Sequence, residues 1–179
     1  KSILPLLFLG AALLLIFTAY NPQWLKQSDK PSMNLVAPRK TSTNDPQGSQ
    51  ALLQEGWGYF YRDSLKNYLK AQEKFVGSVE KNQGNTEALT MLMMTYLQLW
   101  PHVKQDSKDQ ATVQNVMRQA LQSDPYGSRQ AIINATFDLI LSQNNNTQVT
   151  IDQGIARQPS EGRLYFLKGM HLLGLEDFR

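Results

Sequence analysis

A helix-end pattern returns after 34 residues, and this recurrence constrains the fold more than any other feature of the chain. The stretch ALQSDP at 120–125 and the stretch GIARQP at 154–159 share an order of small, apolar, polar and proline residues. Because proline cannot continue a helix, both stretches mark helix C-termini. A fixed period of roughly 20 to 50 residues indicates stacked copies of one supersecondary unit. The pattern therefore predicts an all-α fold of repeated helical pairs.

Apolar residues at helical spacing lie between these helix ends. They predict one helix over about 87–100, ended by Pro101, and a second over about 108–123. Glycine or alanine at a helix crossing lets the two backbones approach closely. Large and small residues alternate at such a spacing in the first and last units: Leu52, Gly56 and Tyr59, with Tyr68, Ala71, Phe75 and Ser78 on the following helix, and later Tyr165, Gly169 and Leu172.

The period, the small residues and the closing prolines resemble the tetratricopeptide repeat (TPR) family. The resemblance covers residues 50–179 and implies an α-solenoid of about three and a half helical hairpins. One departure is the loop PHVKQDSKDQ, which is longer than the family pattern. The second helix of the last unit has barely begun at Arg179, so we expect the repeat domain to continue. A helical bundle without repeats is the alternative fold.

An uncharged apolar run precedes this domain. Residues 3–20 would form a helix about 27 Å long, close to the hydrocarbon thickness of a bilayer. Tyr20 and Trp24 fall where interfacial aromatic residues are found, and Lys26 follows in the headgroup region. We therefore expect a transmembrane anchor over 1–25. The alternatives are a secretory signal peptide, for which FTAYNP is a poor cleavage site, and a buried helix of a soluble domain.

Residues 26–49 contain three prolines, many small polar residues and no apolar period. This composition predicts a flexible linker that lets the repeat domain stand away from the membrane. The absence of cysteine and the abundance of asparagine and glutamine favour an extracytoplasmic domain, in a bacterial periplasm. The basic residues after the span favour the cytoplasmic side instead. In either orientation we expect a single-pass membrane protein.

The charge distribution argues against nucleic-acid binding. Residues 1–47 carry five basic and two acidic residues, a net charge of +3, and residues 48–179 carry 13 of each. Nucleic-acid binding needs a clustered basic face, which is missing. The two histidines, 69 residues apart, form no metal-spaced pair, and phosphate-loop and nucleophile motifs are absent. The sequence therefore predicts a protein that is not an enzyme, without cofactor, metal or small-molecule substrate.

The TPR resemblance also implies a binding groove. In that family the first helices of successive units line a concave face. Many TPR co-chaperones clamp a C-terminal carboxylate there with lysine and asparagine, but Leu53, Thr90, Ile132 and Phe166 take the first of these places. An apolar groove suits an amphipathic helix or an apolar segment of another protein, although the same residues could be core. The apolar groove positions are Leu53, Trp57, Phe60, Met94, Leu97, Ile132, Leu139, Phe166, Met170 and Leu173.

These expectations combine into a membrane-anchored protein-interaction scaffold. Its partners would be other proteins, such as subunits of a bacterial cell-envelope complex for secretion, pilus assembly or motility. One alternative is an extracytoplasmic quality-control or assembly factor that receives exported chains near the translocon or in cytochrome c maturation. Another alternative is a cytosol-facing import receptor of an organelle membrane.

Overall fold

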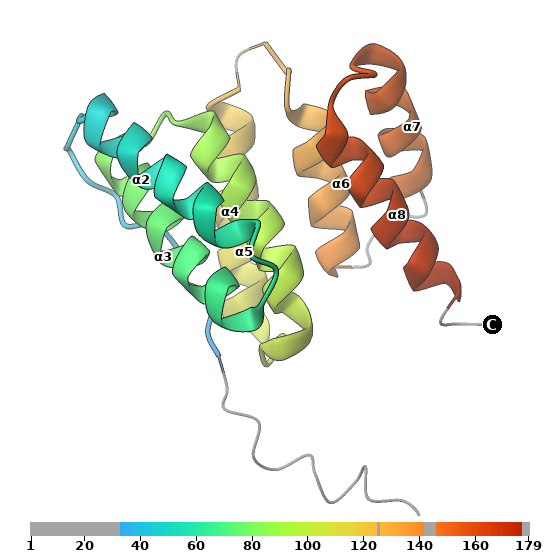
Figure 1. Ribbon diagram of the computed structural model, residues 1–179, viewed down its shortest axis with the longest axis horizontal. Coiled ribbons are helices and arrows are strands. Elements are labelled where there is room, and N and C mark those ends of the chain that lie inside the picture. Colours follow the sequence, from blue (N-terminus) through green and yellow to red (C-terminus); the bar gives the residue numbers. More distant parts are fainter. Residues whose placement is uncertain (1–32, 125, 142–145, 177–179) are drawn as a thin grey trace, which may run out of the picture. The chain divides into compact units, whose positions relative to one another are not determined.

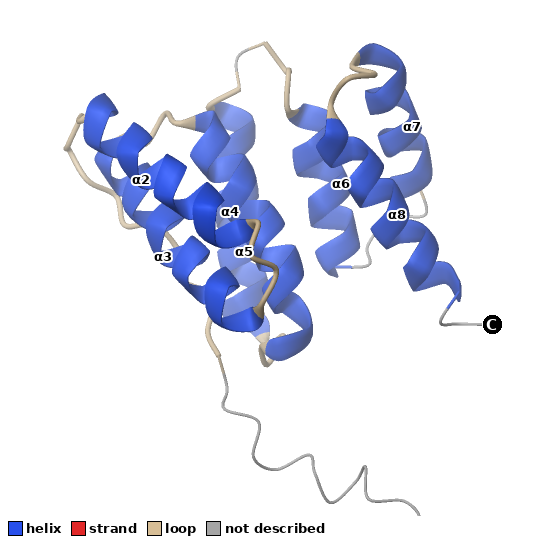
Figure 2. Ribbon diagram, in the orientation of Figure 1, coloured by secondary structure: helices blue, strands red, loops and turns tan. Residues whose placement is uncertain are grey.

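The computed structural model describes residues 33–124, 126–141 and 146–176. Within these ranges the regular structure is helical, apart from one isolated bridge between Met33 and Val103 (Figure 1, Figure 2). This confirms the all-α class predicted from the sequence. The helices are α2 (Pro46–Phe60), α3 (Leu65–Lys81), α4 (Thr86–Leu99), the 3-10 turn η1 (Trp100–His102), α5 (Ser107–Gln122), α6 (Gln130–Leu141), α7 (Thr147–Arg157) and α8 (Gly162–Glu176).

The predicted membrane span at 3–20 lies outside the described residues, as do Tyr20, Trp24 and Lys26 at its expected interface. Among the helices that are described, none combines the length and the apolar character needed to cross a bilayer. The anchor over 1–25 therefore stays a prediction from the sequence.

Side-chain caps fix where the two central helices begin. Asn85 accepts a hydrogen bond from the backbone N–H of Ala88 (3.1 Å) at the start of α4. Asp106 accepts from the backbone N–H groups of Lys108 and Asp109 at the start of α5. Such caps satisfy donors that the first turn of a helix leaves without partners. The predictions over 87–100 and 108–123 are thus correct to within one residue at each end.

Helices that follow one another in the chain pack side by side from α2 to α8. In addition, α4 packs on α6, and α6 packs on α8. This arrangement of paired helices, in which α4 also meets α6 and α6 also meets α8, is compatible with an α-solenoid. Helix α4 is its centre, because all residues from 88 to 97 are buried. A helix that is apolar all round requires neighbours on every side, and α3, α5 and α6 supply them.

Two glycines allow close helix contacts. A Cβ atom on Gly56 of α2 would lie 2.4 Å from Cε1 of Phe75 on α3. A Cβ atom on Gly154 of α7 would lie 2.8 Å from the Cβ of Ala131 on α6. Both separations are shorter than van der Waals contact, so any larger residue must displace a neighbouring side chain or shift the helix. The small residues that the sequence pattern singled out at these crossings therefore set the spacing of two helix pairs.

Residues 33–45 form an extended segment, here called the N-terminal strap, which packs on the helices. Leu35 is buried, its N–H donates to Asp109 (3.4 Å), and the N–H of Val36 donates to Gln72 (3.1 Å). The hydroxyl of the buried Tyr96 donates to the carbonyl of Val36 (2.7 Å). This differs from the flexible linker expected over 26–49. The domain begins at 33 instead of 50, because side chains distant in sequence satisfy the polar groups of the strap.

Candidate functional site

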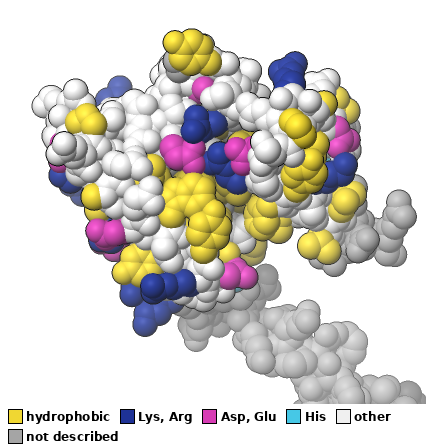
Figure 3. All heavy atoms as spheres, turned by 45° about the horizontal axis from the view of Figure 1, so that its top comes forward, with side chains coloured by type: hydrophobic (Ala, Val, Ile, Leu, Met, Phe, Trp, Pro, Cys, Tyr) yellow, Lys and Arg dark blue, Asp and Glu magenta, His cyan; other side chains and the backbone are white. Residues whose placement is uncertain are grey.

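Helices α2, α4 and α8 enclose an apolar groove with a volume of about 690 Å³. We call it the α2–α4–α8 groove. Figure 3 shows hydrophobic side chains gathered beside a cluster of acidic and basic side chains in a hollow of this face. A concave surface of this size with mostly apolar walls and few polar groups is typical of a binding site. The lining residues are Trp57, Phe60, Tyr61, Asp63, Tyr68, Met91, Met94, Gln98, Glu161, Gly162, Arg163, Phe166 and Met170.

Five of the ten groove positions expected from the sequence line this groove together. Trp57 and Phe60 come from α2, Met94 from α4, and Phe166 and Met170 from α8. Trp57 and Met170, the first and last of these residues, are 113 positions apart in the chain, and the stacking of the helices brings all five to one surface. Phe166 is 41% exposed, so part of the apolar wall is open to solvent.

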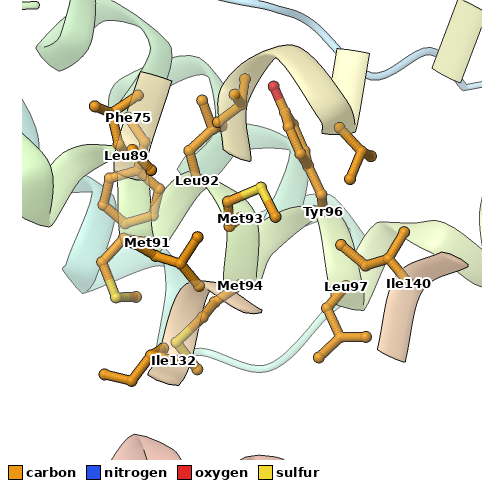
Figure 4. Close-up of a cluster of buried hydrophobic side chains, with 14 of the residues drawn as sticks. Phe75, Leu89, Met91, Leu92, Met93, Met94, Tyr96, Leu97, Ile132 and Ile140 are labelled. Carbon is orange, nitrogen blue, oxygen red and sulfur yellow. The ribbon is translucent and has the colours of Figure 1, made fainter. Parts of the chain in front are cut away.

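The other five expected residues lie elsewhere. Leu53, Leu97 and Ile132 belong to the buried core, and Figure 4 shows Leu97 and Ile132 in that cluster. Leu139 packs half-buried against the same core, and Leu173 on α8 is 61% exposed, outside the groove lining. Because α4 packs directly on α6, part of the apolar surface of both helices belongs to the core, whereas Met91 and Met94 of α4 still line the groove.

Aromatic rings form the α2 side of the groove. The ring centroids of Trp57 and Tyr61 lie 5.1 Å apart, and the rings of Phe60 and Tyr68 meet edge to face at 5.4 Å. Such pairs prefer these offset and edge-on geometries, which fix the rings relative to one another. Helices α4 and α8 contribute the flexible side chains of Met91, Met94 and Met170. The lining therefore combines fixed aromatic rings with adaptable methionines.

An ion-pair cluster lies at the edge of the groove, which the sequence pattern did not indicate. Arg163 of α8 donates to Glu87 of α4 (2.7 Å) and to both carboxylate oxygens of Glu161 (2.8 and 2.7 Å). Arg129, just before α6, also donates to Glu87 (2.6 Å). The hydrogen bonds from Arg163 lower the pKa of Glu161, against the effect of its burial. This cluster joins the three helices α4, α6 and α8 through paired charges.

Two groove residues that the sequence analysis missed, Met91 and Gln98, lie on the same face of α4 as Met94. Met91 and Gln98 are placed three residues before and four residues after Met94, the spacing at which helical side chains line one face. That spacing was a usable signal, since Met94 was itself predicted. Tyr61, Asp63 and Tyr68 were missed for another reason. Tyr61 and Asp63 belong to the turn between α2 and α3, where no helical period applies, whereas Tyr68 lies in α3, a helix that the groove prediction did not include.

Gln98 differs from the other polar groups of the groove. Its side-chain nitrogen Nε2 is buried and, within the part of the chain that the structure describes, has no hydrogen-bond partner. Most buried polar atoms in proteins do have one. Asp63, by contrast, accepts a hydrogen bond from the Tyr68 hydroxyl; burial, together with this bond, raises the pKa of Tyr68. Gln98 is therefore a lining residue whose buried donor lacks an acceptor.

The groove offers binding chemistry. Over the described ranges, no group of three or more histidine, aspartate or glutamate side chains could hold a metal ion.

No protein-family model matches the chain, and neither a curated protein nor a solved structure matches it. The arrangement of rings, methionines and one unpartnered amide is the feature from which a function can be inferred.

Proposed function

We propose that this chain is a membrane-tethered scaffold whose helical-repeat domain captures a segment of another protein in the α2–α4–α8 groove. The observation that supports the proposal is the convergence of Trp57, Met94 and Phe166 from three helices on one partly open apolar surface. Burying such a surface against an apolar segment is favourable by about 25 cal/mol per Å². The TPR resemblance supports the same function, because solenoids of this kind bind proteins on one face.

Because the N-terminal strap packs on the helices, the tether between the expected membrane span and the domain consists only of the residues before Met33. If residues 3–20 span the membrane, twelve residues separate Tyr20 from Met33, the first residue of the described domain. Fully extended, this stretch reaches about 44 Å. The groove would thus work close to the membrane surface, where subunits of a bacterial cell-envelope complex meet. We therefore include in the proposal a role as an assembly subunit of such a complex. The extracytoplasmic side is proposed from the absence of cysteine and the abundance of asparagine and glutamine.

The three methionines of the groove favour a second candidate, an assembly or quality-control factor that receives varied chains. Flexible thioether side chains adapt to occupants of different shape, as on promiscuous binding surfaces. The two functions differ in the lifetime of the complex. A scaffold subunit copurifies with its partner in fixed stoichiometry after detergent extraction, whereas a quality-control factor gives transient crosslinks to several chains.

A site-specific crosslinker tests the proposal in the intact cell. The photoreactive amino acid p-benzoylphenylalanine would replace Phe166 in the groove or, as a control, Tyr126, an aromatic residue that is 94% exposed and does not line the groove. We expect discrete crosslinked bands from position 166 and none of these bands from position 126. The substitution Trp57→Ser should remove the bands from position 166. Equal crosslinking from both positions, or bands that persist with Trp57→Ser, would exclude the groove as the capture site.

A further inference from the structure

The unpartnered amide of Gln98 indicates what the groove recognises. The residue is in the last turn of α4, and its side chain lines the groove on the same face as Met91 and Met94. Because no described residue accepts a hydrogen bond from Nε2, turning the amide toward the groove breaks no existing hydrogen bond. A buried donor without an acceptor is destabilising, and an occupant that supplies an oxygen atom removes that cost.

Asp63 gives the groove an unbalanced negative charge. Its carboxylate accepts from the Tyr68 hydroxyl but forms no ion pair with any described residue. Arg163, the one cationic side chain in the lining, is already matched by Glu87 and Glu161. The backbone of Asp63 has a φ of 42°, a left-handed conformation that aspartate tolerates and that places this residue at the turn bordering the groove. A cationic side chain on the occupant would balance the charge of Asp63.

The unpartnered donor of Gln98 favours an extended occupant over a helical one, although the groove is long enough for either. On α8 the lining runs from Gly162 to Met170, which corresponds to about 12 Å of helix. A stretch of that length holds roughly two turns of a helix or about four residues of extended chain. A helix uses its own carbonyl groups internally except in the last turn, whereas an extended chain presents free carbonyl groups along its length. The unpartnered Gln98 donor therefore fits an extended chain.

We propose that the occupant is an extended segment of a partner protein with an apolar side chain beside a lysine or arginine. The apolar side chain lies against Trp57, Met94 and Phe166. A main-chain carbonyl of the segment accepts a hydrogen bond from Gln98 Nε2, and the basic side chain pairs with Asp63. This inference depends on the proposed function, since it names the chemistry of the segment that the groove captures.

Peptide binding to the full chain in lipid nanodiscs tests the inference. The probes are fluorescein-labelled, amidated pentapeptides with a central leucine or phenylalanine followed by lysine, serine or glutamate, and binding is measured by fluorescence anisotropy. We expect the lysine peptides to bind about fivefold more tightly than the serine peptides and the glutamate peptides to bind least. Asp63→Asn should remove this ranking. Gln98→Leu should weaken binding about fivefold while raising the unfolding temperature, because it removes an unpartnered buried amide.

The matched control is Gln114→Leu, an exposed glutamine on α5 outside the groove, which should change neither peptide binding nor the preference for lysine. If Gln98→Leu binds like wild type, or if Asp63→Asn keeps the lysine preference, the inference is wrong. If only peptides stapled as helices bind, or if no probe binds wild type, the extended basic-apolar segment is likewise excluded. In those cases, crosslinking from position 166 that is lost with Trp57→Ser would still support the proposed function. The failure of this inference can therefore be told apart from the failure of the proposed function.

Discussion

Arg163 and Glu87 are 76 residues apart in the chain, and Nη1 of Arg163 donates to Oε1 of Glu87 at 2.7 Å. The pair joins the first turn of α8 to the first turn of α4 and so fixes the distance between two walls of the groove. Only 17% of the Arg163 side chain and 21% of the Glu87 side chain are exposed. Because the pair is partly buried, removing one partner costs more than it would on the surface, since it leaves a partly buried charge without compensation.

Substituting Arg163 should destabilise the domain. Arg163→Ala leaves Glu161 without its bidentate partner and Glu87 with Arg129 alone, so we expect a loss of about 1–3 kcal/mol of unfolding free energy. Chemical denaturation of the purified chain measures it. Lys168→Ala serves as the control, because Lys168 pairs with Asp152 on the exposed side of the same helix and its removal should leave the denaturation midpoint nearly unchanged. Equal effects of the two variants would contradict a special role for the Glu87–Arg163 contact.

The same cluster gives the stability of the domain a defined pH dependence. Arg163 lowers the pKa of Glu161 in the folded state below its ordinary value of 4.5. The unfolded state then binds more protons, so the contribution of Glu161 is complete above about pH 5 and is lost as the pH falls through the folded-state pKa. Glu161→Gln should therefore be less stable than wild type at pH 7, and the difference should shrink below pH 4.5. Denaturation series at pH 3 to 7 measure it; a constant difference would contradict this assignment.

The helical pairs were predictable because their signals are local. Asn85 and the closing proline at 101 set the limits of α4, and Asp106 sets the start of α5. Ala71, Phe75 and Ser78 occupy buried contact positions as their spacing indicated. Five of the ten groove positions that the TPR resemblance implied line the groove. The exact helix faces that line the groove could not be predicted, because the angle at which α4 meets α6 decides whether a residue such as Ile132 lies in the groove or in the core.

Two features were not accessible from local pattern. The ion pairs of Arg163 connect residues up to 76 positions apart, and sequence spacing carries no information about such pairs. On α8, Tyr165 and Leu172 matched the large positions of the repeat pattern, yet they are 49% and 47% exposed, and Gly169 has no neighbouring atom within 4 Å of a Cβ position among the described residues. A pattern of this kind identifies a face that can be buried but not which element buries it.

Two glycines of α2 should respond in opposite ways to alanine. At Gly56 a new Cβ would lie 2.4 Å from the buried ring of Phe75, so Gly56→Ala should cost about 1–3 kcal/mol through displacement of that ring. Gly58 is exposed with open space around its Cβ position, and Gly58→Ala should stabilise the helix by up to about 1 kcal/mol. Thermal unfolding of the two variants provides the comparison. Stabilisation by both substitutions would show that the distance between α2 and α3 is larger than in this structure.

The strap supplies a prediction that separates a packed segment from a flexible linker. Arg39 is the first trypsin site of the described strap; its N–H donates to Glu80 (3.0 Å) and its carbonyl accepts from Gln83 (2.8 Å). Cleavage there requires local opening, so we expect the Arg39–Lys40 bond to resist limited trypsin digestion. Leu35→Ala removes a side chain that is 4% exposed, should cost about 2–3 kcal/mol, and should make the site sensitive. Val36→Ala, next to it but 49% exposed, should leave cleavage unchanged. Rapid cleavage of the wild type at Arg39 would restore the linker interpretation for this segment, with a correspondingly longer reach from the membrane.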